Sequence, residues 1–231
     1  MIFDKLKSRL KDIAVSNRSI KRTYYTGKSL FLSNEFKHIE LEITSFCNRK
    51  CLYCPNVSFD RIDSSGSFLM KDEIINTVVN QLKEINFRGT LAPHMYGETL
   101  AHPEIVEITE KVSKAGIKLV IYTNADYLTQ ELMDKLRAAG LYKLSISKHS
   151  KNLSKSSMNV LRKVFDNLSE YKSLEMTDIF KKMNGKDVEI DGLIFKIVDF
   201  YTDFHTTKEM LHNRGGELDI ELKKNSRPVG C

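Results

Sequence analysis

The hydrophobic positions along the 231-residue chain follow two alternating periods beyond residue 36. Short apolar or alternating runs predict strands, and apolar residues three and four positions apart predict helices. Strands are expected at 38–46, 91–96, 117–122, 141–147 and 193–201, and helices at 66–85, 102–115, 129–139 and 157–171. The expected ends of the first three helices are Gly89, Gly116 and Gly140. The stretch 172–191 fits neither pattern, so a sixth strand is left open.

This alternation predicts an α/β fold in which helical crossovers join parallel strands, as in a partial (β/α)6 TIM-like barrel. In such folds, functional residues gather at the carboxyl ends of the strands. Several polar or small residues follow the expected strands, namely Gly97, Glu98, Thr99, Thr123, Asn124 and Ser147. These residues, together with a cysteine-rich loop after the first strand, are therefore the candidate site.

The first 36 residues have a different composition from the rest of the chain. Residues 1–28 contain eight lysines and arginines against two aspartates, which accounts for the formal net charge of +6 of the whole chain. Apolar residues at helical spacing within 2–13 predict a basic amphipathic helix. Its charged face could contact an acidic partner, a membrane surface or nucleic acid, or could simply be solvated while the helix packs on the protein. We therefore divide the chain into this segment, a core at 37–212 and a junction at 213–231.

Composition narrows the class of protein. Hydrophobic residues make up 41% of the chain, enough for one sizeable core. No stretch approaches 18 consecutive apolar residues, and charges appear at once after Met1, so neither a transmembrane segment nor a signal peptide is expected. Three of the four cysteines lie within eight residues, which favours metal binding over a disulfide framework. A cytoplasmic protein of a reducing compartment is expected.

The cysteine loop reads Cys47-Asn-Arg-Lys-Cys51-Leu-Tyr-Cys54. Three thiolates can hold three irons of a [4Fe-4S] cluster, and the fourth iron is then open to a small molecule. The alternative is a zinc site, which would need a fourth ligand. The candidates for that ligand lie far away in the sequence: His38, His94, His102 and Cys231.

Residues 38–170 resemble the radical S-adenosylmethionine (SAM) superfamily. The cysteine loop resembles that family's CxxxCxφC motif, with Tyr53 in the aromatic position. The run from Met95 to Thr99 is similar to its glycine–glycine–glutamate–proline element after the second strand. Tyr122-Thr-Asn124 and Leu144-Ser-Ile-Ser147 resemble its third and fourth strand ends. The ordered succession is more specific than any single motif.

The resemblance implies that Cys47, Cys51 and Cys54 bind a [4Fe-4S] cluster whose open iron binds SAM. Reductive cleavage of SAM would give a 5′-deoxyadenosyl radical that takes a hydrogen atom from a small-molecule or peptide substrate. An electron donor such as flavodoxin or ferredoxin is implied as a partner. The SAM contacts that the resemblance implies are Tyr53, Gly97, Glu98, Thr99, Asn124 and Ser147.

The chain departs from the family pattern at three places. Tyr96 replaces the first glycine of the second-strand element, and Thr99 replaces its proline. His149 stands where many relatives have an acidic residue. No arginine follows nearby to bind the SAM carboxylate, and the remaining cations are point charges: Lys148, Lys151 and Lys155.

Residues 213–231 resemble the junction at which many relatives pass into a cysteine-rich SPASM or twitch extension, and the chain stops at Cys231. Relatives with this junction are oxidoreductases or modify peptides and sugars. An enzyme of that kind is therefore expected. The alternative is a truncated or degenerate iron–sulfur and SAM-binding protein that serves as a non-catalytic partner or scaffold.

Overall fold

The computed structural model describes residues 37–51, 54, 56, 68–150 and 153–200. The chain divides into two compact units, Met1–Phe36 and Lys37–Cys231, and all described residues belong to the second. The expected basic helix within 1–36 and the expected junction at 213–231 lie outside the described residues. Both therefore remain predictions.

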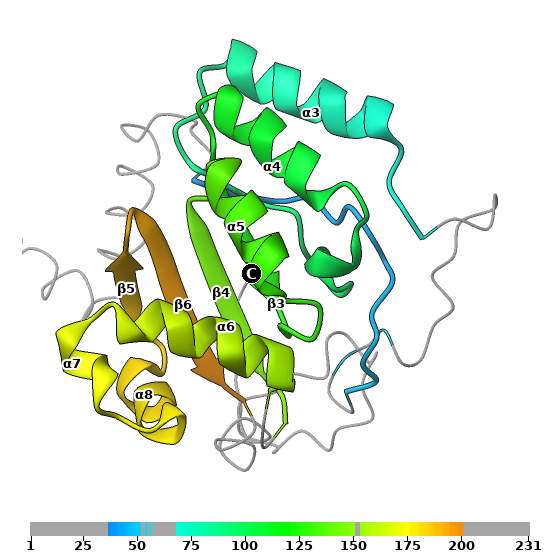
Figure 1. Ribbon diagram of the computed structural model, residues 1–231. Coiled ribbons are helices and arrows are strands. Elements are labelled where there is room, and N and C mark those ends of the chain that lie inside the picture. Colours follow the sequence, from blue (N-terminus) through cyan, green and yellow to red (C-terminus); the bar gives the residue numbers. More distant parts are fainter. Residues whose placement is uncertain (1–36, 52–53, 55, 57–67, 151–152, 201–231) are drawn as a thin grey trace, which may run out of the picture. The chain divides into compact units, whose positions relative to one another are not determined.

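The core of the described unit is a six-stranded sheet with the order β1-β2-β3-β4-β6-β5. Figure 1 labels the strands β3 to β6 of this sheet. Its strands are β1 (His38–Glu40), β2 (Thr90–Ala92), β3 (Lys118–Thr123), β4 (Lys143–Lys148), β5 (Asp187–Ile190) and β6 (Leu193–Asp199). From β1 to β6 each strand pairs in parallel with its neighbour, whereas β5 pairs antiparallel at the edge of β6. The α/β class and the parallel sheet are confirmed. The strand that the sequence left open is β5, and it forms an antiparallel edge.

Helices α3 to α6 lie along one face of this sheet (Figure 1). The helices are α3 (Asp72–Glu84), the short 3-10 helix η2 (Thr99–Ala101), α4 (Ile105–Lys114), α5 (Gln130–Ala138), α6 (Lys155–Asp166), α7 (Ser169–Lys172) and α8 (Met176–Met183). Within the described part of the chain, none of them combines the length and the apolar character that a membrane-spanning helix requires.

The two faces of the sheet differ in polarity. Leu119 and Ile121 of β3 belong to the buried core that includes residues of the helices. Because successive strand residues point to opposite faces, Tyr122 lies on the other face. In β4 the same alternation places Ser145, the register partner of Tyr122, on the face opposite Leu144. We call this face, away from the helices, the inner face.

Strand β1 is shorter than the expected 38–46. Its ladder with β2 stops near Ala92, because the next residue, Pro93, has no amide hydrogen to donate. The following segment pairs elsewhere: Ser45 N donates to Phe68 O at 2.9 Å, and Met70 N donates to Ile43 O at 2.8 Å. Residues 68–70 are therefore extended, and helix α3 begins at Asp72 instead of near residue 66.

The expected helix ends are partly confirmed. Gly116 and Gly140 follow α4 and α5 with φ values of 75° and 85°, the left-handed conformation that favours glycine. Helix α3 instead ends through Asn86, with φ of 53°. Gly89 has another role, because a Cβ there would lie 2.4 Å from the carbonyl oxygen of Lys37. That glycine allows the chain to pass close to β1.

The later part of the chain shows two differences from the sequence-based expectation. The helix expected at 157–171 is two helices, α6 and α7, because Leu168 is extended between them. The stretch 172–191 contains α8 and β5. A tight turn at Asp191 and Gly192, with φ values of 50° and 77°, joins β5 to β6. Such left-handed pairs match the twist of antiparallel hairpins.

Two neighbouring isoleucines of α3 test which face of this helix is buried. Ile75 is 1% exposed in the core, whereas Ile74 is 48% exposed. Ile75→Ala should lower the free energy of unfolding by about 2–5 kcal/mol through lost burial and a cavity. Ile74→Ala should change it by less than about 0.5 kcal/mol. Urea denaturation of both variants measures the difference, and equal effects would show that the helix is turned otherwise.

Candidate functional site

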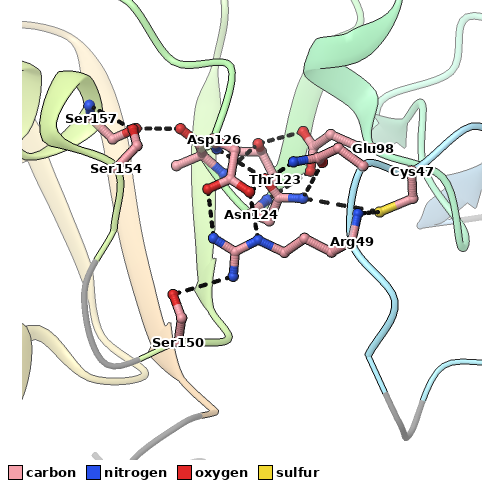
Figure 2. Close-up of polar contacts among 11 residues, drawn as sticks. Cys47, Arg49, Glu98, Thr123, Asn124, Asp126, Ser150, Ser154 and Ser157 are labelled. Atoms are coloured by element: carbon pink, nitrogen blue, oxygen red, sulfur yellow. Dashed lines mark hydrogen bonds and ion pairs between the residues drawn. The ribbon is translucent and has the colours of Figure 1, made fainter.

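A buried carboxylate joins the carboxyl ends of β2 and β3. Glu98 is 3% exposed, and its Oε1 accepts hydrogen bonds from Leu100 N at 3.0 Å and Thr123 Oγ1 at 2.5 Å. Its Oε2 accepts from Asn124 N at 2.8 Å (Figure 2). Burial raises the pKa of Glu98, and these donors act against that rise. Glu98 thus caps η2 and holds the loop that follows β3.

Gly97 lies directly against the segment that leads into the cysteine loop. A Cβ at this position would lie 1.9 Å from the carbonyl oxygen of Thr44. The next amide, Glu98 N, donates to Phe46 O at 2.7 Å. Gly97 N itself donates to Glu42 Oε1 at 3.0 Å. Glycine is therefore required here by the approach of the chain itself.

Cys47 is half-buried at the start of the cysteine loop. Its Sγ accepts from Arg49 N at 3.4 Å, and Asn124 Nδ2 lies 4.0 Å from the same sulfur. Burial raises the pKa of the Cys47 thiol from 9.0 to about 11, with smaller contributions from Glu98, Cys51 and Cys54. Such a thiol stays protonated at neutral pH until a metal displaces the proton.

The donor set of the loop fits an iron–sulfur cluster. Cys47, Cys51 and Cys54 are all free thiols, and Cys54 N donates to Cys51 O at 2.9 Å. Among the described residues, no group of three or more Cys, His, Asp or Glu side chains converges as the ligands of one metal ion do. In a four-iron cluster each thiolate binds a different iron, so the three sulfurs need not converge on one point.

Of the expected SAM contacts, Asn124 lies beside the cysteine loop. It is 5% exposed, its Nδ2 donates to Asn48 Oδ1 at 2.9 Å, and its Oδ1 accepts from Asp126 N at 2.9 Å. Thr99 is fully buried, and its hydroxyl donates to Pro93 O at 3.1 Å, toward the end of β2. The SAM-binding roles of both residues remain predictions.

The residues at the end of β4 lie on both faces of the sheet, and the SAM-binding role of Ser147 stays a prediction. Ser147 is half-buried opposite Val198 on the inner face. Lys148 points to the helix side, where its Nζ contacts Asp199 Oδ2 at 2.8 Å. His149 stacks on Phe200 with ring centroids 5.2 Å apart. Burial, with a further contribution from Arg49, lowers the pKa of His149 from 6.5 to about 4, so this ring is neutral at pH 7. Tyr53 lies outside the described residues.

The structure brings to the site several residues that sequence reasoning did not place there: Arg49 and Asp126 were given no role, and His94 was considered only as a distant zinc ligand. Arg49 and Asp126 form an ion pair at 2.5 Å between the cysteine loop and the end of β3. His94 lies against Tyr122, with ring centroids 5.2 Å apart, and interacts electrostatically with Glu40 and Glu42. The only sequence signals were their positions next to the expected strand ends and between the cysteines.

Comparison with curated proteins identifies relatives. The S-adenosyl-L-methionine-dependent 2-deoxy-scyllo-inosamine dehydrogenase of Niallia circulans is 32% identical over 200 residues, covering 85% of this chain and 66% of that protein. The AdoMet-dependent heme synthase of Methanosarcina barkeri is 33% identical over 119 residues, covering 50% of this chain and 32% of that protein. The chain thus spans less than two thirds of each of these relatives.

A solved structure agrees with the fold. The crystal structure of BtrN in complex with AdoMet and 2-DOIA matches with a TM-score of 0.57 and 27% sequence identity, covering 81% of this chain and 64% of that one. The family model described as the Radical SAM superfamily matches residues 41–200, which include the cysteine loop, Glu98 and Asn124. Members of this superfamily use a [4Fe-4S] cluster and SAM. The chain belongs to the radical SAM superfamily.

Proposed function

We propose that this chain carries the catalytic core of an enzyme that cleaves SAM reductively and takes a hydrogen atom from an organic substrate. A [4Fe-4S] cluster held by Cys47, Cys51 and Cys54 would supply the electron for that cleavage. The observation that carries the proposal is that Asn124 Nδ2 lies 4.0 Å from Cys47 Sγ. Asn124 belongs to the loop after β3, which Glu98 holds in place at the strand ends.

The surrounding residues support this role through position and charge. Asn124 presents an amide toward Cys47 Sγ, and hydrogen bonds to cluster sulfurs are one means by which proteins tune reduction potential. Gly97 has no side chain and the side chain of Glu98 is buried, so SAM would meet mainly the backbone at the ends of β2 and β3. Ser147 would contact SAM from β4, on the inner face. Placing SAM beside the open iron makes its cleavage selective.

We infer that the substrate is a small polar molecule, and that the hydrogen atom is taken from a carbon that bears a hydroxyl group. The inner face carries polar side chains from three strands, namely Glu42 after β1, Tyr122 on β3 and the buried Ser145 on β4. The hydroxyl and amine groups of a small molecule match such donors and acceptors. The dehydrogenase from Niallia circulans, named for 2-deoxy-scyllo-inosamine, supports the same class.

His94 is the strongest candidate for substrate contact. Its Nδ1 is buried and has no hydrogen-bond partner among the described residues. Burial lowers the pKa of His94 below 6.5, although Glu40, Glu42 and a hydrogen bond with the Gly97 backbone oppose that shift, so the ring is mostly neutral at pH 7. A neutral imidazole can accept a proton or a hydrogen bond from a substrate hydroxyl.

The proposal also includes two protein partners. One is an electron donor such as flavodoxin or ferredoxin, and the other is an acidic partner for residues 1–36.

The first test is formation of 5′-deoxyadenosine. The full chain is reconstituted with iron and sulfide without oxygen, then given SAM and dithionite. The wild type should bind about four irons per chain and form 5′-deoxyadenosine. Cys51→Ala should lose both, because the loop then lacks one of its three thiolates. Iron analysis and chromatography of the product measure the two effects.

Cys231→Ser is the matched control, because Cys231 lies outside the cysteine loop in the sequence and is not among the expected ligands of the [4Fe-4S] cluster. This variant should keep the cluster and form deoxyadenosine at the wild-type rate. A wild-type protein that holds a full cluster and yet forms no deoxyadenosine would contradict the proposed activity. Stoichiometric zinc in anaerobically purified protein would contradict the cofactor.

The second test concerns the substrate side. Deuterated polyols and amino-polyols are screened for transfer of deuterium into 5′-deoxyadenosine. With a substrate found in this way, His94→Gln should lower the fraction of deoxyadenosine that carries deuterium by on the order of tenfold, because a misplaced substrate donates less often. Mass spectrometry measures that fraction directly.

His38→Gln provides a comparison within the same face. His38 lies at the amino end of β1, where its Nδ1 shares a hydrogen bond with Thr90 Oγ1 at 2.7 Å. The deuterated fraction should stay within about twofold of the wild type, since this end of the sheet is remote from the strand ends that form the site. An equal loss in both histidine variants would argue against a specific role for His94.

A further inference from the structure

A polar cluster beside the cysteine loop has no place in the proposed chemistry. Asn48 and Arg49 lie between Cys47 and Cys51 in the sequence, and both donate hydrogen bonds to Asp126. Asp126 follows β3, 77 residues away from Arg49. Figure 2 shows the Arg49 side chain reaching from the cysteine loop to this carboxylate.

The contact between Arg49 and Asp126 is a two-point fork. Nε donates to Oδ2 at 2.6 Å and Nη2 donates to Oδ1 at 2.5 Å, while Nη1 lies 3.4 Å from Ser150 Oγ in the loop after β4. The two side chains are only 17% and 23% exposed. The Arg49 guanidinium lowers the pKa of Asp126, so the carboxylate is ionised at neutral pH. Bidentate pairs of this kind fix orientation as well as distance.

A strained turn aims Asp126 at the loop. Ala125 has a φ of 65°, a left-handed conformation that is costly for a residue with a Cβ. Its amide donates to Thr123 Oγ1 at 2.8 Å, and its carbonyl accepts from Ser157 Oγ on α6. These contacts hold the turn in place, and the carboxylate of the next residue, Asp126, meets Asn48 and Arg49 of the cysteine loop.

The same cluster fixes the polar contact at Cys47. Asn48 Nδ2 donates to Asp126 Oδ2 at 2.8 Å, and Asn48 Oδ1 accepts from Asn124 Nδ2 at 2.9 Å. Asn124 Nδ2 is thereby held 4.0 Å from Cys47 Sγ. Residues that orient metal ligands in this way commonly control how tightly the metal is held.

We propose that Arg49 and Asp126 form a clamp that positions the cysteine loop for cluster binding. We call this pair the Arg49–Asp126 clamp. Both are positioning residues: they bind the loop to the ends of β3 and β4 and act on the cluster through Cys47 and Cys51. The inference rests on the proposed cluster, but not on SAM cleavage or on any substrate.

One alternative role for Arg49 is to bind the carboxylate of SAM. The guanidinium already uses two of its three nitrogens on Asp126. An arginine that bound SAM would change the KM for SAM while leaving the retention of iron unchanged. A clamp changes the retention of iron whether or not SAM is present, so the two roles give different results.

The test is the rate at which the reconstituted full chain loses iron to excess ferrous chelator, without oxygen and without SAM. Asp126→Asn and Arg49→Gln should each release iron about tenfold faster than the wild type, as expected when roughly 1.4 kcal/mol of loop stabilisation is lost. The double variant should be no faster than either single variant, because the pair acts as a unit. The EPR spectrum of the dithionite-reduced cluster should change in all three.

Arg137→Gln and Asp191→Asn provide the matched control. These residues form another Arg–Asp pair, at 3.4 Å, remote from the cysteine loop in the sequence. Both variants should release iron at the wild-type rate. The melting temperature of the cluster-free protein should shift by less than about 4 °C in every variant, because partly exposed pairs contribute little to global stability.

Wild-type release rates in Asp126→Asn and Arg49→Gln would refute the clamp. Additive effects in the double variant would refute it as well. If Asp126→Asn does not fold, Arg49→Lys decides the question: it keeps the charge but loses the fork, so its release rate should still rise. A wild type that binds four irons but forms no deoxyadenosine would end the proposed function and leave this test intact.

Discussion

Glu98 places a carboxylate where the ends of β2 and β3 meet, and three donors from different parts of the chain converge on it. A buried carboxylate without such partners would cost several kcal/mol. Moving the loop after β3 would remove the bonds from Thr123 and Asn124 and leave the Glu98 oxygens short of partners. The position of Asn124, and through it the surroundings of Cys47, therefore follow from this one buried group.

Two close backbone contacts transmit that order to the cysteine loop. Gly97 lets the Thr44 carbonyl pass at a distance that a side chain would block, and Glu98 N binds Phe46 O just before Cys47. The cysteine loop is thus held at two places, by Gly97 and Glu98 after β2 and by Asp126 after β3. Both supports come from strand ends, as expected for a site built on a parallel sheet.

The sequence predicted the alternation of strands and helices along the chain. It also identified the cysteine loop and Glu98 as a candidate site, because their spacing is a local signal, and the structure places both at strand ends. The sequence overestimated the length of β1, because the apolar pattern continues to Ile43. In the structure the ladder with β2 ends at Pro93, and Ile43 pairs instead with Met70. The sequence left β5 open, although Asp191-Gly192 is a hairpin signal. The pairing of Arg49 with Asp126 could not be predicted, because 77 residues separate them and only the fold brings them together.

The charges around the cysteine loop bear on how the proposed cluster would be bound. Glu98 and Asp126 both interact with the guanidinium of Arg49, and Glu98 also disfavours the thiolate of Cys47. Deprotonating three cysteines here would add negative charge beside two carboxylates that share this arginine. In the proposed cluster, iron ions would supply the positive charge that stabilises those thiolates, and the sulfonium and ammonium groups of SAM would add to it. Under that proposal, the carboxylate that orders the strand ends also favours positive charge beside Cys47.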